Sequence, residues 1–130
     1  MSAKFLLSLF ALTVLPAGAV AAADEGDWRA GRKIFKTCGA CHSFRSGQAK
    51  FGPSLAGVIG REAGHVPDYP YSEGMKAKGV GGLVWSEETI DEFITAPNKF
   101  VPGTKMNFPG LPDPKDRRNV IAYVKRKAKR

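Results

Sequence analysis

The sequence predicts an all-α domain in which a few helices are joined by loops rich in glycine and proline. Apolar residues recur at helical spacing near both ends of the chain, in residues 28–38 and 120–124. Between these segments no alternating strand pattern persists, and the chain's 15 glycines and 9 prolines interrupt regular structure. A chain of 130 residues has the size of one domain.

Residues 1–23 are expected to be a secretory signal peptide and not part of the fold. Lys4 supplies a positive charge, an apolar run follows it, and small residues then offer cleavage after Ala21 or Ala23. The domain would then cover residues 24–130. The alternative is an uncleaved membrane anchor, but Pro16 and the alanine-rich end make the segment only weakly apolar.

The first helix is expected to begin after Asp27, a residue type that caps helix N-termini. Its apolar positions include Ile34 and Phe35, and it would bring residues 38–42 to its C-terminal end. Gly31 inside this helix costs about 1 kcal/mol relative to alanine. We therefore expect a close approach to another helix at Gly31 that offsets this cost.

Residues 38–42 read Cys-Gly-Ala-Cys-His, the attachment signature of a c-type haem. Each thiol adds across one vinyl group, and both vinyl groups lie on one edge of the ring. Two intervening residues let one turn of chain span that edge. His42 then lies under the iron, where a neutral imidazole nitrogen can bind it.

Three other uses of the two cysteines fit the sequence less well than haem attachment. A redox-active pair would sit where a strand meets a helix, and no such pattern surrounds Cys38. A zinc site needs a fourth ligand, but only His65 remains elsewhere. A disulfide across so short a loop would be strained and would leave His42 without a role.

The middle of the chain is expected to contain loops and two helices. Residues 43–64 are a loop interrupted by glycines. Ser72 caps a short helix that ends at Lys78, and residues 79–82 form a glycine-rich surface turn. Ser86 starts a second helix that runs to about residue 95, and Pro97 stops it.

Met106 is a candidate for the second axial ligand of a haem iron. Methionine is the usual choice in cytochromes that carry electrons. Met106 lies in residues 101–108, a loop interrupted by proline and glycine, and far along the sequence from His42. The alternative, a methionine that fills a gap in the core, suits Met75 better. After this loop, Asp113 is expected to cap the last helix, which starts at Pro114.

Several segments resemble class I cytochromes c, in the same order and at nearly the same spacings. They are residues 31–35 (Gly-Arg-Lys-Ile-Phe), 38–42, 51–55 (Phe-Gly-Pro-Ser-Leu), 60–61, 84–89, 97–106 and 121–125. The chain resembles this family from about Gly26 onward, and most of all mitochondrial cytochrome c and soluble bacterial cytochromes of the c-two type. The resemblance implies the cytochrome c fold, wrapped around one covalently attached haem c.

The resemblance also implies the haem-site residues. Cys38 and Cys41 would hold the haem covalently, and His42 and Met106 would bind its iron. The Pro53 carbonyl would accept the outer N–H of His42. The other residues expected around the haem are Arg61 near a propionate, Tyr71 and Trp85 at the inner propionate, Thr104, and Phe108 over the haem edge. Phe93 stands where many members have a tyrosine near the methionine sulfur. The first and last helices would cross with Gly31 and Phe35 against Val120 and Tyr123.

This ligand set predicts a one-electron carrier that cycles between Fe(II) and Fe(III), and not an enzyme. Both axial positions would be taken, so oxygen or peroxide finds no open site. We expect a soluble monomer in the periplasm. The alternatives are a cytochrome subunit of a periplasmic dehydrogenase and a membrane-tethered carrier that keeps its N-terminal segment.

The expected partners are redox proteins with acidic docking surfaces. The chain has a net charge of +8, and family members dock through lysines around the exposed haem edge. The matching positions here are Lys33, Lys50, Lys99 and Lys105. The resemblance implies a quinol–cytochrome c oxidoreductase as donor and a terminal oxidase or photosynthetic reaction centre as acceptor. No pattern of stacked aromatic and basic residues indicates nucleic acid.

Overall fold

The computed structural model describes residues 25–129, so the expected signal peptide lies outside the described residues. The helices are α1 (Trp28–Gly39), α2 (Glu73–Val80), α3 (Glu87–Thr95), α4 (Pro97–Phe100) and α5 (Pro114–Lys127). Within the described range, β pairing is limited to one isolated bridge between Glu62 and Val84. The predicted all-α fold is confirmed.

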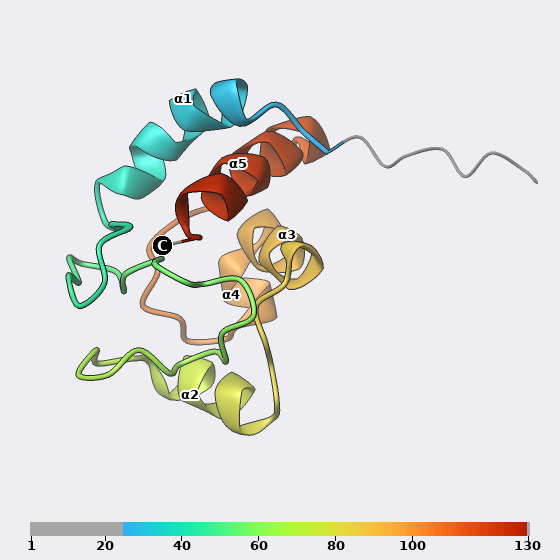
Figure 1. Cartoon of the computed structure of the whole chain (residues 1–130). Helices are drawn as coiled ribbons and strands as arrows, with labels where there is room; N and C mark the ends of the chain where they lie inside the picture. The colour runs from blue at the N-terminus through green and yellow to red at the C-terminus, as the bar shows by residue number, and fades with distance from the viewer. Residues whose placement is uncertain (1–24, 130) are drawn as a thin grey trace, which may run out of the picture.

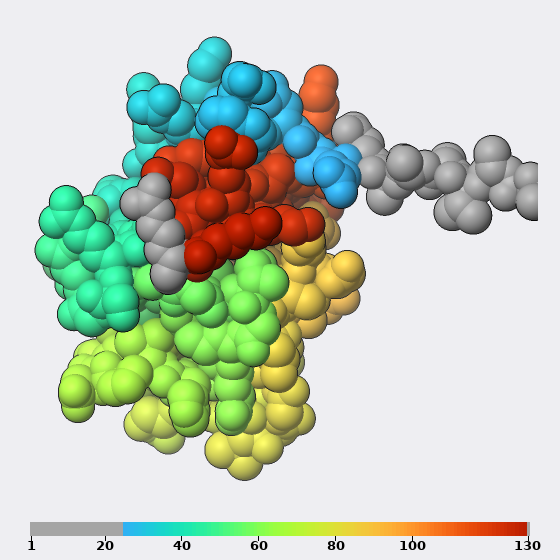
Figure 2. All heavy atoms as spheres, viewed as in Figure 1, coloured from blue at the N-terminus to red at the C-terminus, as the bar shows by residue number. Residues whose placement is uncertain are grey.

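Helix α1 lies along α5 at one end of the molecule, α2 lies at the other end, and α3 and α4 lie between them (Figure 1). Loops connect the helices. On the face shown in Figure 2, the loops that follow α1, coloured green, cover the surface between α5 and α2. No helix within residues 25–129 is long and apolar enough to cross a membrane.

The three predicted N-caps, Asp27, Ser72 and Asp113, are present, and Ser86, which was expected to start a helix, caps α3. In each case a side-chain oxygen of the cap accepts a backbone N–H from the first turn of its helix. The caps are Asp27 for α1, Ser72 for α2, Ser86 for α3 and Asp113 for α5. Such bonds satisfy amides that have no partner inside the helix. Pro97 ends α3 as predicted, but it also begins α4, a short helix that the sequence analysis did not predict.

Helices α1 and α5 are in close contact at Gly31. A Cβ at this position would collide with the backbone carbonyl oxygen of Asn119, so only glycine allows this approach. Around the crossing, Phe35 lies 5.2 Å from Tyr123 between ring centroids. The backbone N–H of Asp27 donates to the buried side chain of Asn119 at 2.7 Å. The expected helix crossing is confirmed for Gly31, Phe35 and Tyr123, and Asn119 is an additional contact.

The glycine-rich segment after Lys78 differs from the prediction. Helix α2 continues to Val80, and Gly79 is buried inside it rather than in a surface turn. A Cβ at Gly79 would collide with the carbonyl oxygen of Ala63, so the glycine lets α2 lie directly on the preceding loop. The turn proper is confined to Gly81 and Gly82, and only Gly82 has a positive φ, of 86°.

The core lies between the two ends of the molecule. Val101 is fully buried, and Trp85 and Phe93 pack with ring centroids 5.3 Å apart. Helix α5 contributes Val120, Ile121 and Val124. Tyr123, which was also expected in the buried face, is only half-buried.

We predict that Gly31→Ala lowers the free energy of unfolding of the haem-loaded protein by about 2 kcal/mol, because overpacking typically costs about 1–3 kcal/mol. Gly39→Ala is the matched control, since its Cβ would meet nothing closer than Phe35 at 3.5 Å. Denaturant unfolding followed by helical circular dichroism measures both. Equal stabilities of the two variants would contradict the tight crossing.

Candidate haem site

A cavity of about 680 Å³ lies between α1, α3, α5 and the long loops. Its walls are mainly apolar, with side chains such as Leu55, Ile90 and Val124. All ten residues that the sequence analysis assigned to haem or iron line this one cavity: Cys38, Cys41, His42, Pro53, Arg61, Tyr71, Trp85, Thr104, Met106 and Phe108. The fold therefore brings together residues that are far apart in the sequence.

The cysteine–histidine motif straddles the end of α1. Cys38 lies in the last turn of the helix, which ends at Gly39, so residues 38–42 lie at its C-terminal end as expected. Cys41 and His42 follow in a turn whose two backbone N–H groups donate to the Cys38 carbonyl, at 3.0 and 2.9 Å. This turn keeps both thiols and the imidazole at the same cavity.

The thiol of Cys38 has little thiolate character. Burial raises its pKa, and the neighbouring Cys41 adds to the rise. A redox-active Cys-x-x-C pair needs the opposite, a cysteine whose pKa is lowered. The raised pKa of Cys38 therefore disfavours thiol redox chemistry at this pair of cysteines.

The His42 ring is held between a carbonyl group and a glycine. Its Nδ1 lies 2.8 Å from the Pro53 carbonyl oxygen, the contact that the resemblance implied. Burial lowers the pKa of His42, so the neutral imidazole is favoured at neutral pH. A neutral ring that donates from Nδ1 leaves Nε2 as the nitrogen available to a metal.

Gly52 is a site residue that the sequence analysis missed. A Cβ at Gly52 would collide with the His42 ring. Its own N–H donates to the Cys41 carbonyl at 2.8 Å, which fastens the loop against the motif. The only signal in the sequence was a glycine directly before the proline that contacts His42.

Met106 projects from a loop that is tied down by its own backbone. The Met106 N–H donates to the Thr104 hydroxyl at 3.2 Å, and the Phe108 N–H donates to the Met106 carbonyl at 3.0 Å. Lys105 donates to the Pro70 carbonyl at 2.6 Å. Met106 itself is half-buried and packs against the core.

Arg61 presents a buried donor without a partner. Its two terminal nitrogens donate to the carbonyls of Ala56 and Ser54, at 2.8 and 3.0 Å. Its Nε is the one buried side-chain nitrogen or oxygen in the described part of the chain that has no hydrogen-bond partner. Burial lowers the pKa of Arg61, but an arginine remains charged. A buried, charged N–H in a cavity wall fits an anionic ligand group.

Tyr71 and Trp85 add two further donors to the same cavity. The Tyr71 hydroxyl accepts the Val66 N–H at 3.4 Å, so its own proton remains free to donate. Burial raises the pKa of Tyr71, which keeps the phenol protonated. Trp85 is buried, and its indole N–H can only donate.

These observations match the chemistry of a c-type haem. The cavity offers apolar walls for the ring, an imidazole and a thioether for the iron, two thiols for the vinyl groups, and donors for carboxylates. The most specific of these observations is the unpartnered Arg61 Nε, because a haem propionate would accept its hydrogen bond.

The four lysines expected at the docking surface differ in their position relative to the cavity. Lys105 lines the cavity, and Lys50 donates to the carbonyl of Gly39, within the motif, at 2.8 Å. Lys33 and Lys99 are exposed but do not line the cavity. Tyr69, which the sequence analysis did not assign, also lines it and donates to the Phe51 carbonyl at 2.7 Å.

The fold and this site define a small helical protein that carries a covalently attached haem. The chain belongs to the cytochrome c family, whose model matches residues 28–127. It is accordingly a haem-based electron-transfer protein and not an enzyme, and it binds one haem c through the motif that contains Cys38 and Cys41.

Bacterial and plant relatives are similar over most of their length. Cytochrome c2 of Rhodoblastus acidophilus is 50% identical over 100 residues, which cover 76% of this chain and 91% of the relative. Cytochrome c2 of Agrobacterium tumefaciens (strain II Chrys) is 46% identical over 101 residues, or 77% and 91% of the two chains. Cytochrome c of Ginkgo biloba is 46% identical over 105 residues, or 79% and 90%.

We predict that the chain does not fold cooperatively without haem. Without haem, the mainly apolar walls of this cavity would be exposed to water or to unfilled space. A domain of this size has little other core to offset that loss. The variant Cys38→Ala/Cys41→Ala, produced without haem, should show reduced helical circular dichroism and no cooperative unfolding. Native helix content with a sharp transition would contradict the prediction.

Proposed function

We propose that the chain is a soluble periplasmic one-electron carrier whose haem iron is held by His42 and Met106. The observation that carries the proposal is that one apolar cavity contains a neutral imidazole, the methionine of a fastened loop and both cysteines. A haem with these two ligands supplies reversible one-electron exchange between Fe(II) and Fe(III). No position would remain open for oxygen or peroxide.

The chain's own residues would keep this ligand set unchanged through the cycle. Pro53 orients the His42 ring and raises the basicity of Nε2 by accepting from Nδ1. Because Gly52 has no side chain, the ring can lie directly against the loop backbone. The bonds around Thr104 and Lys105 hold the Met106 backbone. Because little has to move, little reorganisation would oppose electron transfer.

The three hydrogen-bond donors in the cavity wall would stabilise the negative charge of the haem propionates. Arg61 keeps its positive charge, and Tyr71 stays protonated because burial raises its pKa. Trp85 adds a neutral donor. A carboxylate buried in an apolar cavity is costly unless it is paired or hydrogen-bonded. These residues are the groups that would satisfy it.

We predict that Met106→Ala keeps the covalent haem but opens the sixth position, so that the ferrous protein binds carbon monoxide at pH 7. The volume-matched variant Met106→Leu should do the same. Met75→Leu is the control, because Met75 is a buried methionine of the same cavity but is not a proposed ligand. Visible spectra measure all three. Strong carbon monoxide binding by the unmutated protein would contradict the closed site.

Location and partners are part of the same proposal. Cleavage of residues 1–23 would release a periplasmic monomer, and the basic lysines Lys33, Lys50, Lys99 and Lys105 would steer it onto acidic redox partners. A quinol–cytochrome c oxidoreductase would be the donor, and a terminal oxidase or photosynthetic reaction centre the acceptor. The bacterial relatives named cytochrome c2 support this proposal.

We predict that the protein purified from the periplasmic fraction has the mass of residues 24–130 plus one haem, and that salt weakens its binding to its partner. Mass spectrometry and binding at low and high ionic strength test this. A chain that keeps residues 1–23 would support the membrane-tethered alternative. A complex that survives high salt would support the dehydrogenase subunit.

A further inference from the structure

The Met106 loop leaves the cavity through a cluster of polar contacts at the C-terminal end of α3. The Leu111 N–H donates to the Ile94 carbonyl at 2.8 Å. Gly110, with a φ of 107°, lies so close to α3 that a Cβ would collide with the Thr95 carbonyl oxygen. The backbone of residues 110–111 is therefore fixed to the last turn of α3.

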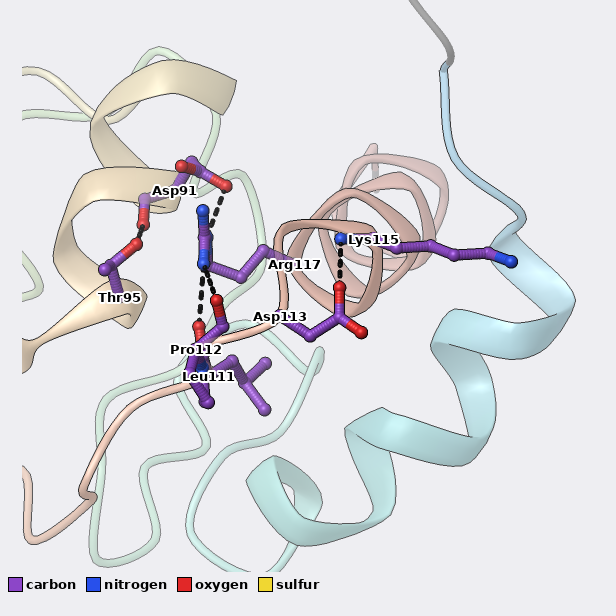
Figure 3. A network of polar contacts seen from close by, with 7 residues as sticks. All are labelled: Asp91, Thr95, Leu111, Pro112, Asp113, Lys115 and Arg117. Atoms are coloured by element: carbon purple, nitrogen blue, oxygen red, sulfur yellow. Dashed lines mark hydrogen bonds and ion pairs between the residues drawn. The ribbon is translucent and has the colours of Figure 1, made fainter.

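Arg117 of α5 closes this cluster from the other side. Figure 3 shows its side chain pointing from α5 toward α3, between Asp91 and the carbonyls of Leu111 and Pro112. Its Nε donates to Asp91 Oδ1 at 2.8 Å, and its Nη1 donates to both carbonyls at 2.9 Å. One guanidinium thus joins α3, α5 and the end of the loop.

The contacts of Arg117 are less exposed to solvent than the other ion pair between these helices. The Arg117 side chain is only 12% exposed, and Asp91 is 35% exposed. A second ion pair between the same helices, Glu87 with Lys125, is 42% exposed on both sides. Breaking a pair that is shielded from water leaves a poorly solvated charge, whereas an exposed pair contributes little. The Asp91–Arg117 pair is the one suited to hold the loop.

We propose that Arg117, oriented by Asp91, is a positioning residue that clamps the end of the Met106 loop and so keeps the Met106 sulfur at the haem iron. This inference rests on the proposed ligation by His42 and Met106. Without the clamp, two carbonyls lose their donor, and residues 107–112 open more often while α3 and α5 stay packed. Met106 then leaves the iron more often, although the protein remains folded.

The test uses the haem-loaded ferric protein at pH 7 and imidazole as a competing ligand. Imidazole displaces the methionine, which is followed by loss of the weak far-red methionine–iron band. We expect Arg117→Gln to raise the apparent imidazole affinity about tenfold and Asp91→Asn about fivefold, since hydrogen bonds to a charged group are lost. Arg117→Lys keeps the charge but cannot form all three bonds, so it should fall between Arg117→Gln and the unmutated protein.

The matched controls are Glu87→Gln and Lys125→Gln, which break the exposed pair between the same helices. They should change imidazole affinity less than about twofold. Amide hydrogen exchange at Leu111 gives a second readout. It should accelerate in Arg117→Gln and Asp91→Asn, and not in the controls, while amides in the middle of α5 stay protected.

Each outcome decides between the proposals. If Arg117→Gln and Asp91→Asn match the controls, the clamp is wrong, although Met106 ligation stands. If the unmutated protein lacks the far-red band, the proposed ligation fails and the clamp with it. If Arg117→Gln does not fold, Asp91→Asn, which retains the arginine and its carbonyl bonds, decides the question alone.

Discussion

The structure depends on a cavity of about 680 Å³ at the centre of a small domain. A chain of this size has little other core to offer, so a bound group has to supply much of its buried apolar surface. Helices α1, α3 and α5 each place residues in the cavity wall, as do the loops between them. The family to which the chain belongs binds one covalently attached haem, so we expect haem binding and folding to be coupled.

Backbone groups do most of the positioning around that cavity. Carbonyls orient the His42 ring and receive the cations of Arg61, Lys105 and Arg117. Glycines allow the approach of segments that any side chain would separate, at Gly31 against α5 and at Gly52 against the imidazole. A loop-rich site can therefore be rigid, because its loops are fastened to helices at many points rather than packed only through side chains.

The sequence was sufficient for features that depend on local chemistry. The caps of four helices follow from Asp and Ser at their starts, and the haem residues follow from the Cys-x-x-Cys-His motif and from the family resemblance. Features that depend on distant contacts were missed. Gly79 belongs to α2 because it packs on Ala63, and Asn119 is buried because it binds the Asp27 backbone. The Asp91–Arg117 contact joins residues 26 positions apart, which no local pattern predicts.

The most direct test of the account is a visible absorption spectrum of the secreted protein in its oxidised and reduced states. The account predicts a covalently bound c-type haem and, in the oxidised state, a weak far-red band from a methionine–iron bond. Covalent haem without that band would contradict ligation by Met106 and the closed electron-transfer site built on it. A protein that contains no haem would contradict the use of Cys38 and Cys41 on which the whole account depends.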